Sequence, residues 1–288
     1  MRRIAIVAYT ARPEAITWAT HAIDRLLEEG VEVIIDTVLE MALDAERAAR
    51  CEVRTAKEFE KRADMVMTFG GDGTLLATAM LLMGSDVPIM GVNVGRLGFL
   101  AEYPVTELDE AIMDVIKGNY RIVDRTTLMV EFNGITAYAL NEVLIERSSE
   151  AKMIAVRAFV NEHHVADYRA DGVIICTPTG STAYSLAAGG PIIAPSANAL
   201  CITPIAPHTL TLRPLIVNDS SEIRCELLGD LSAAHVVADG KILGSARKGE
   251  TVTIRKSEHL VKLVKRADST YYDLLRDKLL WSADATKK

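Results

Sequence analysis

A carboxylate lies inside a glycine-rich bend early in the chain. Residues 69–74 are Phe-Gly-Gly-Asp-Gly-Thr, placed after an apolar run and before a helix-like stretch. Glycines let a backbone turn tightly and approach a ligand closely, and the first amides of a following helix attract phosphate oxygens. Asp72 would repel such an anion unless it helps to hold a metal ion or accepts a proton from an attacking hydroxyl. On spacing alone, a helix-capping Asp in a plain strand-to-helix turn is the alternative.

Two further segments follow strand-like runs and carry groups that suit a nucleotide. Residues 91–100 form a second glycine-spaced loop, and parallel sheets bind ligands beyond the carboxyl ends of their strands. Asn141-Glu142 joins an amide to a carboxylate, a pair that can grip vicinal ribose hydroxyls. Taken alone, each of these segments is equally compatible with an ordinary turn.

A cation and a carboxylate also precede a hydroxyl-rich block. Arg169 and Asp171 are two positions apart, so on a strand they share a face; a structural ion pair is the alternative interpretation. Residues 177–184 (TPTGSTAY) follow closely and could open a helix whose N-terminus faces a ligand.

Several other kinds of site are not indicated. The adjacent His163 and His164 would point to opposite faces of a strand, so no metal site is predicted there. No G-x-S-x-G nucleophile elbow occurs. The cysteines lack C-x-x-C spacing, which favours reduced thiols in a cytoplasmic protein. They are Cys51, Cys176, Cys201 and Cys225.

The sequence argues against two classes of partner, nucleic acid and membrane. The net charge of −7 argues against non-specific binding to nucleic acid. Residues 172–212 contain no Asp, Glu, Lys or Arg, but prolines interrupt them too often for a membrane helix. This segment is therefore predicted to be a buried core segment or the wall of a ligand pocket.

The first 120 residues alternate strand-like and helix-like segments. The length of 288 residues suggests about two domains. Alternation of this kind predicts a parallel sheet covered on both faces. Strands are expected near residues 3–9, 31–35, 65–69 and 88–92, and helices near 16–27, 40–62, 74–83 and 106–117.

The pattern changes near residue 120 to short β-rich runs. Asn133-Gly134 and Asn161-Glu162 predict tight hairpins, and the runs together predict an antiparallel sandwich or barrel. Residues 271–281 form an amphipathic, helix-like end. The other expected strands lie near 172–176, 222–227, 234–238, 251–255 and 259–264.

Taken together and in order, these motifs resemble those of the NAD kinase family. The block TPTGSTAYSLAAGGP at residues 177–191 is the most specific of them, whereas GGDG loops also occur in lipid kinases and phosphofructokinases. The resemblance extends over most of the chain from residue 65 onward. Its other parts are residues 70–74, 91–100, 141–142, 169–172, 203–210, 213–215, 239–240 and 274–281.

The resemblance implies a fold and a reaction. The family has an α/β N-terminal domain with a parallel sheet and an all-β C-terminal sandwich domain, with the C-terminal helix returning to the N-terminal domain. For this chain that implies an α/β domain of residues 1–120 plus the returning residues 268–288, and an NAD-binding sandwich of residues 121–267. The family's reaction is phosphorylation of the adenosine ribose 2′-hydroxyl of NAD, which gives NADP.

The resemblance also implies roles for individual residues. Asp72 would be the catalytic proton acceptor, with Gly73 beside it on the dinucleotide, and Asn141 and Glu142 would contact NAD. The adenosine pocket would be lined by Thr182, Ala183, Tyr184, Ser185, Leu186 and Ala187. The remaining dinucleotide-contacting positions would be Lys152, Arg169, Asp171 and Lys241.

Two of these positions depart from the family's pattern. Relatives often carry Gln or another polar residue where this chain has Lys241. Many relatives have a basic or larger residue at the position of Ala77, so the phosphate donor could be gripped differently here.

The same resemblance implies ATP with Mg²⁺ or another divalent cation as the phosphate donor, with polyphosphate or another triphosphate as alternatives. It also implies a homodimer or homotetramer. Two other functions stay open: a lipid or sphingoid kinase with the same GGDG loop, and a dinucleotide sensor without catalysis. A Rossmann dehydrogenase is disfavoured because residues 9–13 contain no glycine.

Overall fold

The computed structural model describes residues 3–148, 153–228 and 234–281. It divides into two compact units. The first consists of Met1–Asp124 and Val261–Lys288, and the second of Arg125–Leu260.

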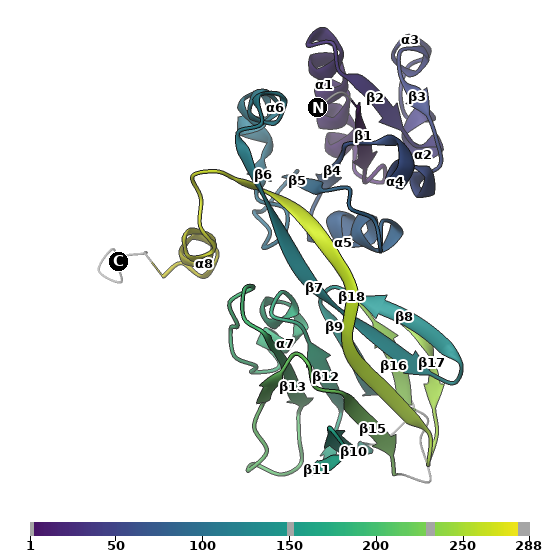
Figure 1. The fold of residues 1–288 in the computed structure, drawn as a ribbon, viewed down its shortest axis with the longest axis vertical. Helices are drawn as coiled ribbons and strands as arrows, with labels where there is room; N and C mark the ends of the chain where they lie inside the picture. The colour runs from purple at the N-terminus through teal and green to yellow at the C-terminus, as the bar shows by residue number, and fades with distance from the viewer. Residues whose placement is uncertain (1–2, 149–152, 229–233, 282–288) are drawn as a thin grey trace. The chain divides into compact units, whose positions relative to one another are not determined.

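The first unit contains a parallel sheet whose strands run in the order β3-β2-β1-β4-β5 (Figure 1). The short strand β6 (Tyr103–Pro104) and the end of β18 (Thr251–Arg266) both pair with β5 in parallel. The main strands are β1 (Arg3–Ala8), β2 (Glu32–Ile35), β3 (Glu52–Val53), β4 (Met65–Gly70) and β5 (Ile89–Asn93).

Helices cover this sheet as the alternating sequence predicts. The apolar stripes of α1 (Pro13–Glu28) and α6 (Leu108–Lys117) share one core with β1, β2, β4 and β5, and α1 lies beside α6 (Figure 1). Helix α5 (Asp72–Leu81) packs against β4 and β5. A 3-10 turn, η2 (Val105–Glu107), leads into α6.

The helix expected over residues 40–62 is wrong. Asp36 and Asp44 accept amide hydrogen bonds that begin two separate short helices, because short polar side chains favour helix starts over helix interiors. An edge strand then interrupts the segment. Its pieces are α2 (Thr37–Glu40), α3 (Ala45–Ala49), β3 (Glu52–Val53), η1 (Ala56–Glu58) and α4 (Phe59–Arg62).

The second unit consists of two antiparallel layers. In the first layer the strand order is β11-β10-β15-β18, with β7 paired to β18 and β8. In the second layer the order is β14-β13-β12-β9-β16-β17. The first layer contains β7 (Tyr120–Phe132), β8 (Ile135–Ala139), β10 (Ile154–Val160), β11 (His163–Ala170) and β15 (Ile223–Leu227). The second contains β9 (Glu142–Arg147), β12 (Gly172–Cys176), β13 (Ala199–Ile205), β14 (Leu215–Asn218), β16 (Ala234–Ala238) and β17 (Lys241–Ala246).

Alternate residues of these layers build one core. Val143 and Ile145 of β9 point into it together with Val156 of β10 and Ile254 of β18, and all four are buried. Both predicted hairpins are present, because Asn133-Gly134 and Asn161-Glu162 adopt the positive φ values that tight turns need. The predicted fold class, an α/β domain with a parallel sheet and an all-β sandwich, is confirmed.

The uncharged segment 172–212 supplies two strands of the second layer, β12 and β13, and residues between them cover the outer face of that layer. Ile174 and Cys176 face outward from β12 and pack with Ile193 in a separate buried cluster. Between β12 and β13 the chain forms η3 (Gly180–Thr182) and α7 (Tyr184–Ala187). Charged groups would be desolvated in this buried cluster, which explains their absence from its positions.

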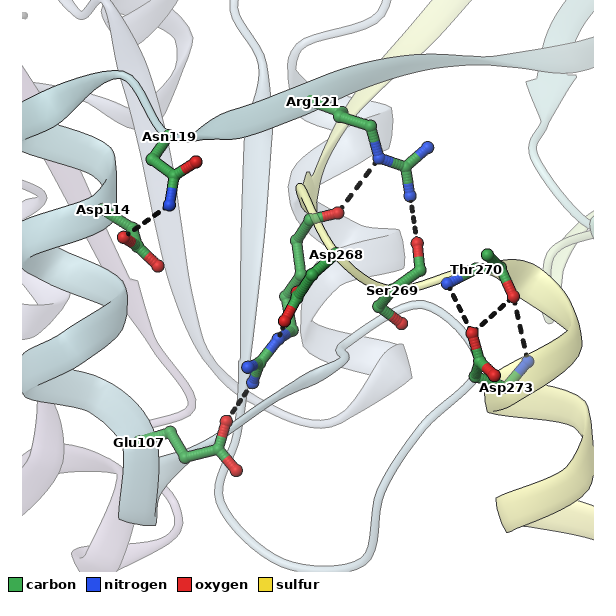
Figure 2. Close-up of polar contacts among 9 residues, drawn as sticks. Glu107, Asp114, Asn119, Arg121, Asp268, Ser269, Thr270 and Asp273 are labelled. Atoms are coloured by element: carbon green, nitrogen blue, oxygen red, sulfur yellow. Dashed lines mark hydrogen bonds and ion pairs between the residues drawn. The ribbon is translucent and has the colours of Figure 1, made fainter.

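The last strand is longer than the sequence predicts. The runs expected at residues 251–255 and 259–264 form one strand, β18, because the three residues between them include no Gly or Pro. Helix α8 (Tyr271–Leu279) follows it and belongs to the first unit. Arg121 donates to the backbone carbonyls of Arg266 and Ser269, and a capping box between Thr270 and Asp273 begins the helix (Figure 2).

Within the described residues, no helix has both the length and the apolar character needed to cross a bilayer.

Candidate active site

Asp72 occupies the first position of a helix that follows a buried strand. Strand β4 ends at Gly70, Gly71 is the N-cap, and α5 begins at Asp72. A Cβ at Gly70 would lie 2.1 Å from Thr74 Oγ1, so only glycine fits this bend. The N-cap of α5 is Gly71 and not Asp72, so Asp72 is not the capping residue of this helix.

The Asp72 carboxylate is instead held by the second glycine loop. Oδ2 accepts the Phe99 amide at 2.8 Å, and Oδ1 accepts the Leu100 amide at 3.1 Å and the Ala101 amide at 2.9 Å. A Cβ at Gly98 would lie 1.8 Å from Asp72 Oδ1. The loops that follow β4 and β5 therefore meet at this carboxylate, and three backbone donors fix its orientation.

A second carboxylate is held in a similar way in the other unit. Asp239 accepts the backbone amides of Leu140, Asn141 and Glu142 at 2.6, 2.9 and 3.0 Å. Burial raises the pKa of Asp239, and the three amide hydrogen bonds oppose that rise. Asp239 thus shapes the turn that carries Asn141-Glu142, a role that the resemblance at residues 239–240 did not imply.

The hydroxyl-rich block holds the same turn from its other side. Thr177 Oγ1 donates to the Leu140 carbonyl at 2.6 Å, and the Thr177 amide donates to the Asn141 carbonyl at 2.9 Å. A Cβ at Gly180 would lie 2.1 Å from the Asn141 carbonyl oxygen. The block therefore packs directly on Asn141.

Glu142 is the most perturbed acid of this cluster. Burial, together with the smaller effect of the Asp239 charge, raises its pKa to about 7, although a hydrogen bond with the Tyr184 backbone opposes the shift. Among the described residues no group hydrogen-bonds the buried Glu142 Oε2. A ligand hydroxyl is a suitable donor for such an oxygen.

Glu142→Gln should remove a pH dependence of stability. With a pKa of about 7 in the folded state against 4.5 ordinarily, Glu142 binds its proton more tightly when folded. Protonated Glu142 contributes about 3 kcal/mol to the free energy of unfolding. This contribution is complete below about pH 4.5 and is lost as pH rises through about 7. Urea unfolding between about pH 5 and pH 8 measures this slope. Glu146→Gln on the same strand is the control and should keep it; a Glu142→Gln protein with the wild-type slope would contradict the assignment.

The predicted adenosine-pocket residues lie together next to this turn. Ser185 is buried and its Oγ lies 2.9 Å from Thr203 Oγ1, while a Cβ at Gly190 would lie 2.3 Å from the same Ser185 Oγ. Tyr184 is exposed. The other members of this stretch are Thr182, Ala183, Leu186 and Ala187, all partly or fully exposed.

Arg169 and Asp171 are not brought to the Glu142 turn within this unit. Asp171 pairs with Arg147 at 3.1 Å rather than with Arg169, which is exposed. Arg147 ends β9 and Glu142 begins it, so the two ends are about 16 Å apart. Their predicted contact with a dinucleotide stays a prediction.

The other predicted positions fall in different surroundings. Lys241 is exposed at the start of β17, directly after the Asp239-Gly240 turn. Gly73 is exposed in the first turn of α5. Lys152 lies outside the described residues. Nowhere in the described ranges do three or more His, Cys, Asp or Glu side chains form a group that could hold a metal ion.

Comparisons with known proteins agree on one family. The model of the ATP-NAD kinase N-terminal domain matches residues 4–120, and that of the C-terminal domain matches residues 140–266. An NAD kinase of Syntrophotalea carbinolica is 38% identical over 286 residues, covering 98% of this chain and 99% of the relative. An NAD kinase of Bacteroides fragilis is 40% identical over 227 residues, and the match covers 77% of this chain and 78% of the relative.

Solved structures share the fold. A yeast NADH kinase complexed with NADH superposes with a TM-score of 0.90 at 24% identity, covering 100% of this chain and 90% of that one. An NAD kinase from Archaeoglobus fulgidus in complex with ATP has a TM-score of 0.78 at 26% identity, covering 96% and 98%. With both domain models matched in order and full-length relatives well above 30% identity, the chain belongs to the NAD kinase family.

Proposed function

We propose that this protein is an NAD kinase that transfers a phosphoryl group from ATP to the 2′-hydroxyl of the adenosine ribose of NAD. NADP and ADP are the products. The observation that carries the proposal is the Asp72 carboxylate, oriented by three amides where two glycine loops meet, in a chain of this family.

A ribose hydroxyl is a poor nucleophile, so the protein must position it and remove its proton. Phosphoryl transfer offers little covalent chemistry to a protein, and positioning and charge neutralisation supply most of the rate. Asp72 accepts the hydroxyl proton as the new O–P bond forms. The three amide donors hold its carboxylate still, so no reorganisation is needed at that moment.

In this proposal the second unit binds the dinucleotide. Asn141 and the buried Oε2 of Glu142, which accepts no hydrogen bond from the described residues, face ribose hydroxyls, and Thr182 to Ala187 line the adenosine pocket. The buried hydrogen bond between the Ser185 and Thr203 hydroxyls holds these residues against β13. Gly73, Lys152, Arg169, Asp171 and Lys241 complete the predicted contacts with NAD.

A divalent cation enters as part of the substrate. Mg²⁺ bound to the triphosphate neutralises phosphate charge, and the structure of a 26%-identical relative with ATP supports ATP as the donor. A cytoplasmic location and a homodimer or homotetramer belong to the same proposal. They rest on the cysteine pattern and on the family resemblance.

A donor and acceptor panel tests this function. Purified protein is incubated with Mg²⁺, with ATP or polyphosphate as donor, and with NAD, NADH or a sphingoid base as acceptor; an NADP-specific dehydrogenase detects the product. We expect NADP from ATP and NAD. ATP consumption only with the lipid alcohol would favour a lipid kinase, and NAD binding without ATP consumption would favour a sensor.

A further inference from the structure

The loop that holds Asp72 is itself held by a buried lysine. Lys265, near the end of β18, is 4% exposed. Its Nζ donates to the Leu100 carbonyl at 3.2 Å and lies 2.5 Å from Glu102 Oε1. The Glu102 side chain is only 13% exposed, so both charges of the pair are largely removed from water.

A single peptide group joins this lysine to the carboxylate. The carbonyl of Leu100 and the amide of Ala101 belong to the same peptide plane and point in opposite directions. The carbonyl accepts from Lys265, and the amide donates to Asp72 Oδ1 at 2.9 Å. A cation that donates to the carbonyl polarises the peptide and strengthens its amide as a donor, as in other chains of hydrogen bonds in the low-dielectric interior of a protein.

A purely stabilising role does not require charges here. A buried ion pair is often matched or exceeded in stability by apolar residues of similar volume. This pair instead supplies a donor to a loop carbonyl that no apolar side chain could satisfy. Lys278 of α8 supports the same loop, because it donates to the Leu97 carbonyl and lies 5.3 Å from the centre of the Phe99 ring.

We propose that Lys265 is a positioning residue for phosphoryl transfer, which fixes the Leu100–Ala101 peptide and thereby the direction of the Asp72 carboxylate. This inference rests on the proposed function, in which Asp72 accepts the hydroxyl proton. Lys265 has no contact with substrate in this scheme and acts only through the loop. It should therefore affect kcat and leave the binding of NAD and ATP nearly unchanged.

The decisive variant removes both charges of the pair. Lys265→Met alone leaves Glu102 buried without its cation and could fail to fold, so Glu102→Leu/Lys265→Met is compared with it. We expect the double variant to fold, with kcat lower by about 10- to 100-fold and both KM values within about twofold of wild type. Lys262→Met is the matched control, since Lys262 lies on the same strand but pairs with Asp86 and Asp124 at the surface.

Two further measurements separate positioning from general stability. Hydrogen exchange of peptides covering residues 97–103 should be faster in the double variant and unchanged in Lys262→Met. In an Asp72→Asn background the double substitution should cost no more than about twofold in residual turnover, because a residue acting through Asp72 has nothing left to position.

The outcomes distinguish the two proposals. Wild-type kcat in the folded double variant, unchanged loop exchange, or an equal loss in the Asp72→Asn background would each overturn the role of Lys265. Normal turnover in Asp72→Asn alone would overturn the proposed role of Asp72, and this inference with it.

Discussion

Asp72→Asn is expected to lower the kcat of NADP formation by about 10²- to 10⁴-fold, the usual contribution of a positioned base. Asparagine keeps the size of the side chain but cannot accept the proton of the ribose hydroxyl. Its carbonyl oxygen retains only part of the amide cradle formed by Phe99, Leu100 and Ala101, so the loop loosens as well. Steady-state kinetics with NAD and ATP varied in turn measures the effect.

Two comparisons make this result specific to catalysis. Binding of NAD, measured by calorimetry, should change little, because Asp72 acts on the reacting hydroxyl. Asp86→Asn is a matched control, since the Asp86 side chain is 98% exposed and should leave kcat unchanged. A folded Asp72→Asn protein with near-normal turnover would remove Asp72 from the proton-accepting role.

The features of the site and of the fold that depend on adjacent residues follow from the sequence. The Gly-Gly-Asp-Gly bend needs glycine because Thr74 fills the space a Cβ would take at Gly70, and such a requirement is visible as a motif. The Asn133-Gly134 hairpin is local in the same sense, since its residue types favour the positive φ values they adopt. Adjacent residues decide these features, so a single sequence predicts them.

The partners of the two carboxylates do not follow from the sequence. Asp72 bonds to amides 27 to 29 positions away, and Asp239 to amides 97 to 99 positions away. Backbone donors carry no residue-type information, so nothing in the chain marks Leu100 or Leu140 as a partner. The packing of whole strands brings these groups together.

The contacts of charged side chains could not be predicted from the sequence either. Lysine is seldom fully buried, so the sequence gives no reason to expect Lys265 inside the first unit. A structural ion pair between Arg169 and Asp171 was the alternative interpretation of their spacing, but Asp171 lies between β11 and β12 and pairs with Arg147 of β9. Lys278 lies in a helix whose amphipathic pattern is predictable, whereas its contact with the Leu97 carbonyl is not.

Gly98→Ala should lower turnover strongly without replacing any ionisable residue. The new methyl would lie 1.8 Å from Asp72 Oδ1 and 2.6 Å from its Cγ, so the short carboxylate side chain must leave its amide cradle. Misplacing a reacting group by about 1 Å can cost about 10²-fold in rate, and we expect kcat to fall by about that amount. Kinetics and thermal unfolding are measured together, to show that the folded state survives.

Gly95→Ala provides the contrast within the same loop. Its methyl would meet Arg12 Nη1 at 2.9 Å, the end of a long, half-exposed side chain that can move aside at little cost. The same chemical change should therefore reduce kcat much less at Gly95 than at Gly98. Equal losses at both positions would mean that general disturbance of the loop, rather than displacement of Asp72, limits turnover. Because the three atoms nearest to the new methyl at residue 98 all belong to the Asp72 side chain, the difference between the two variants isolates the orientation of the carboxylate from its charge.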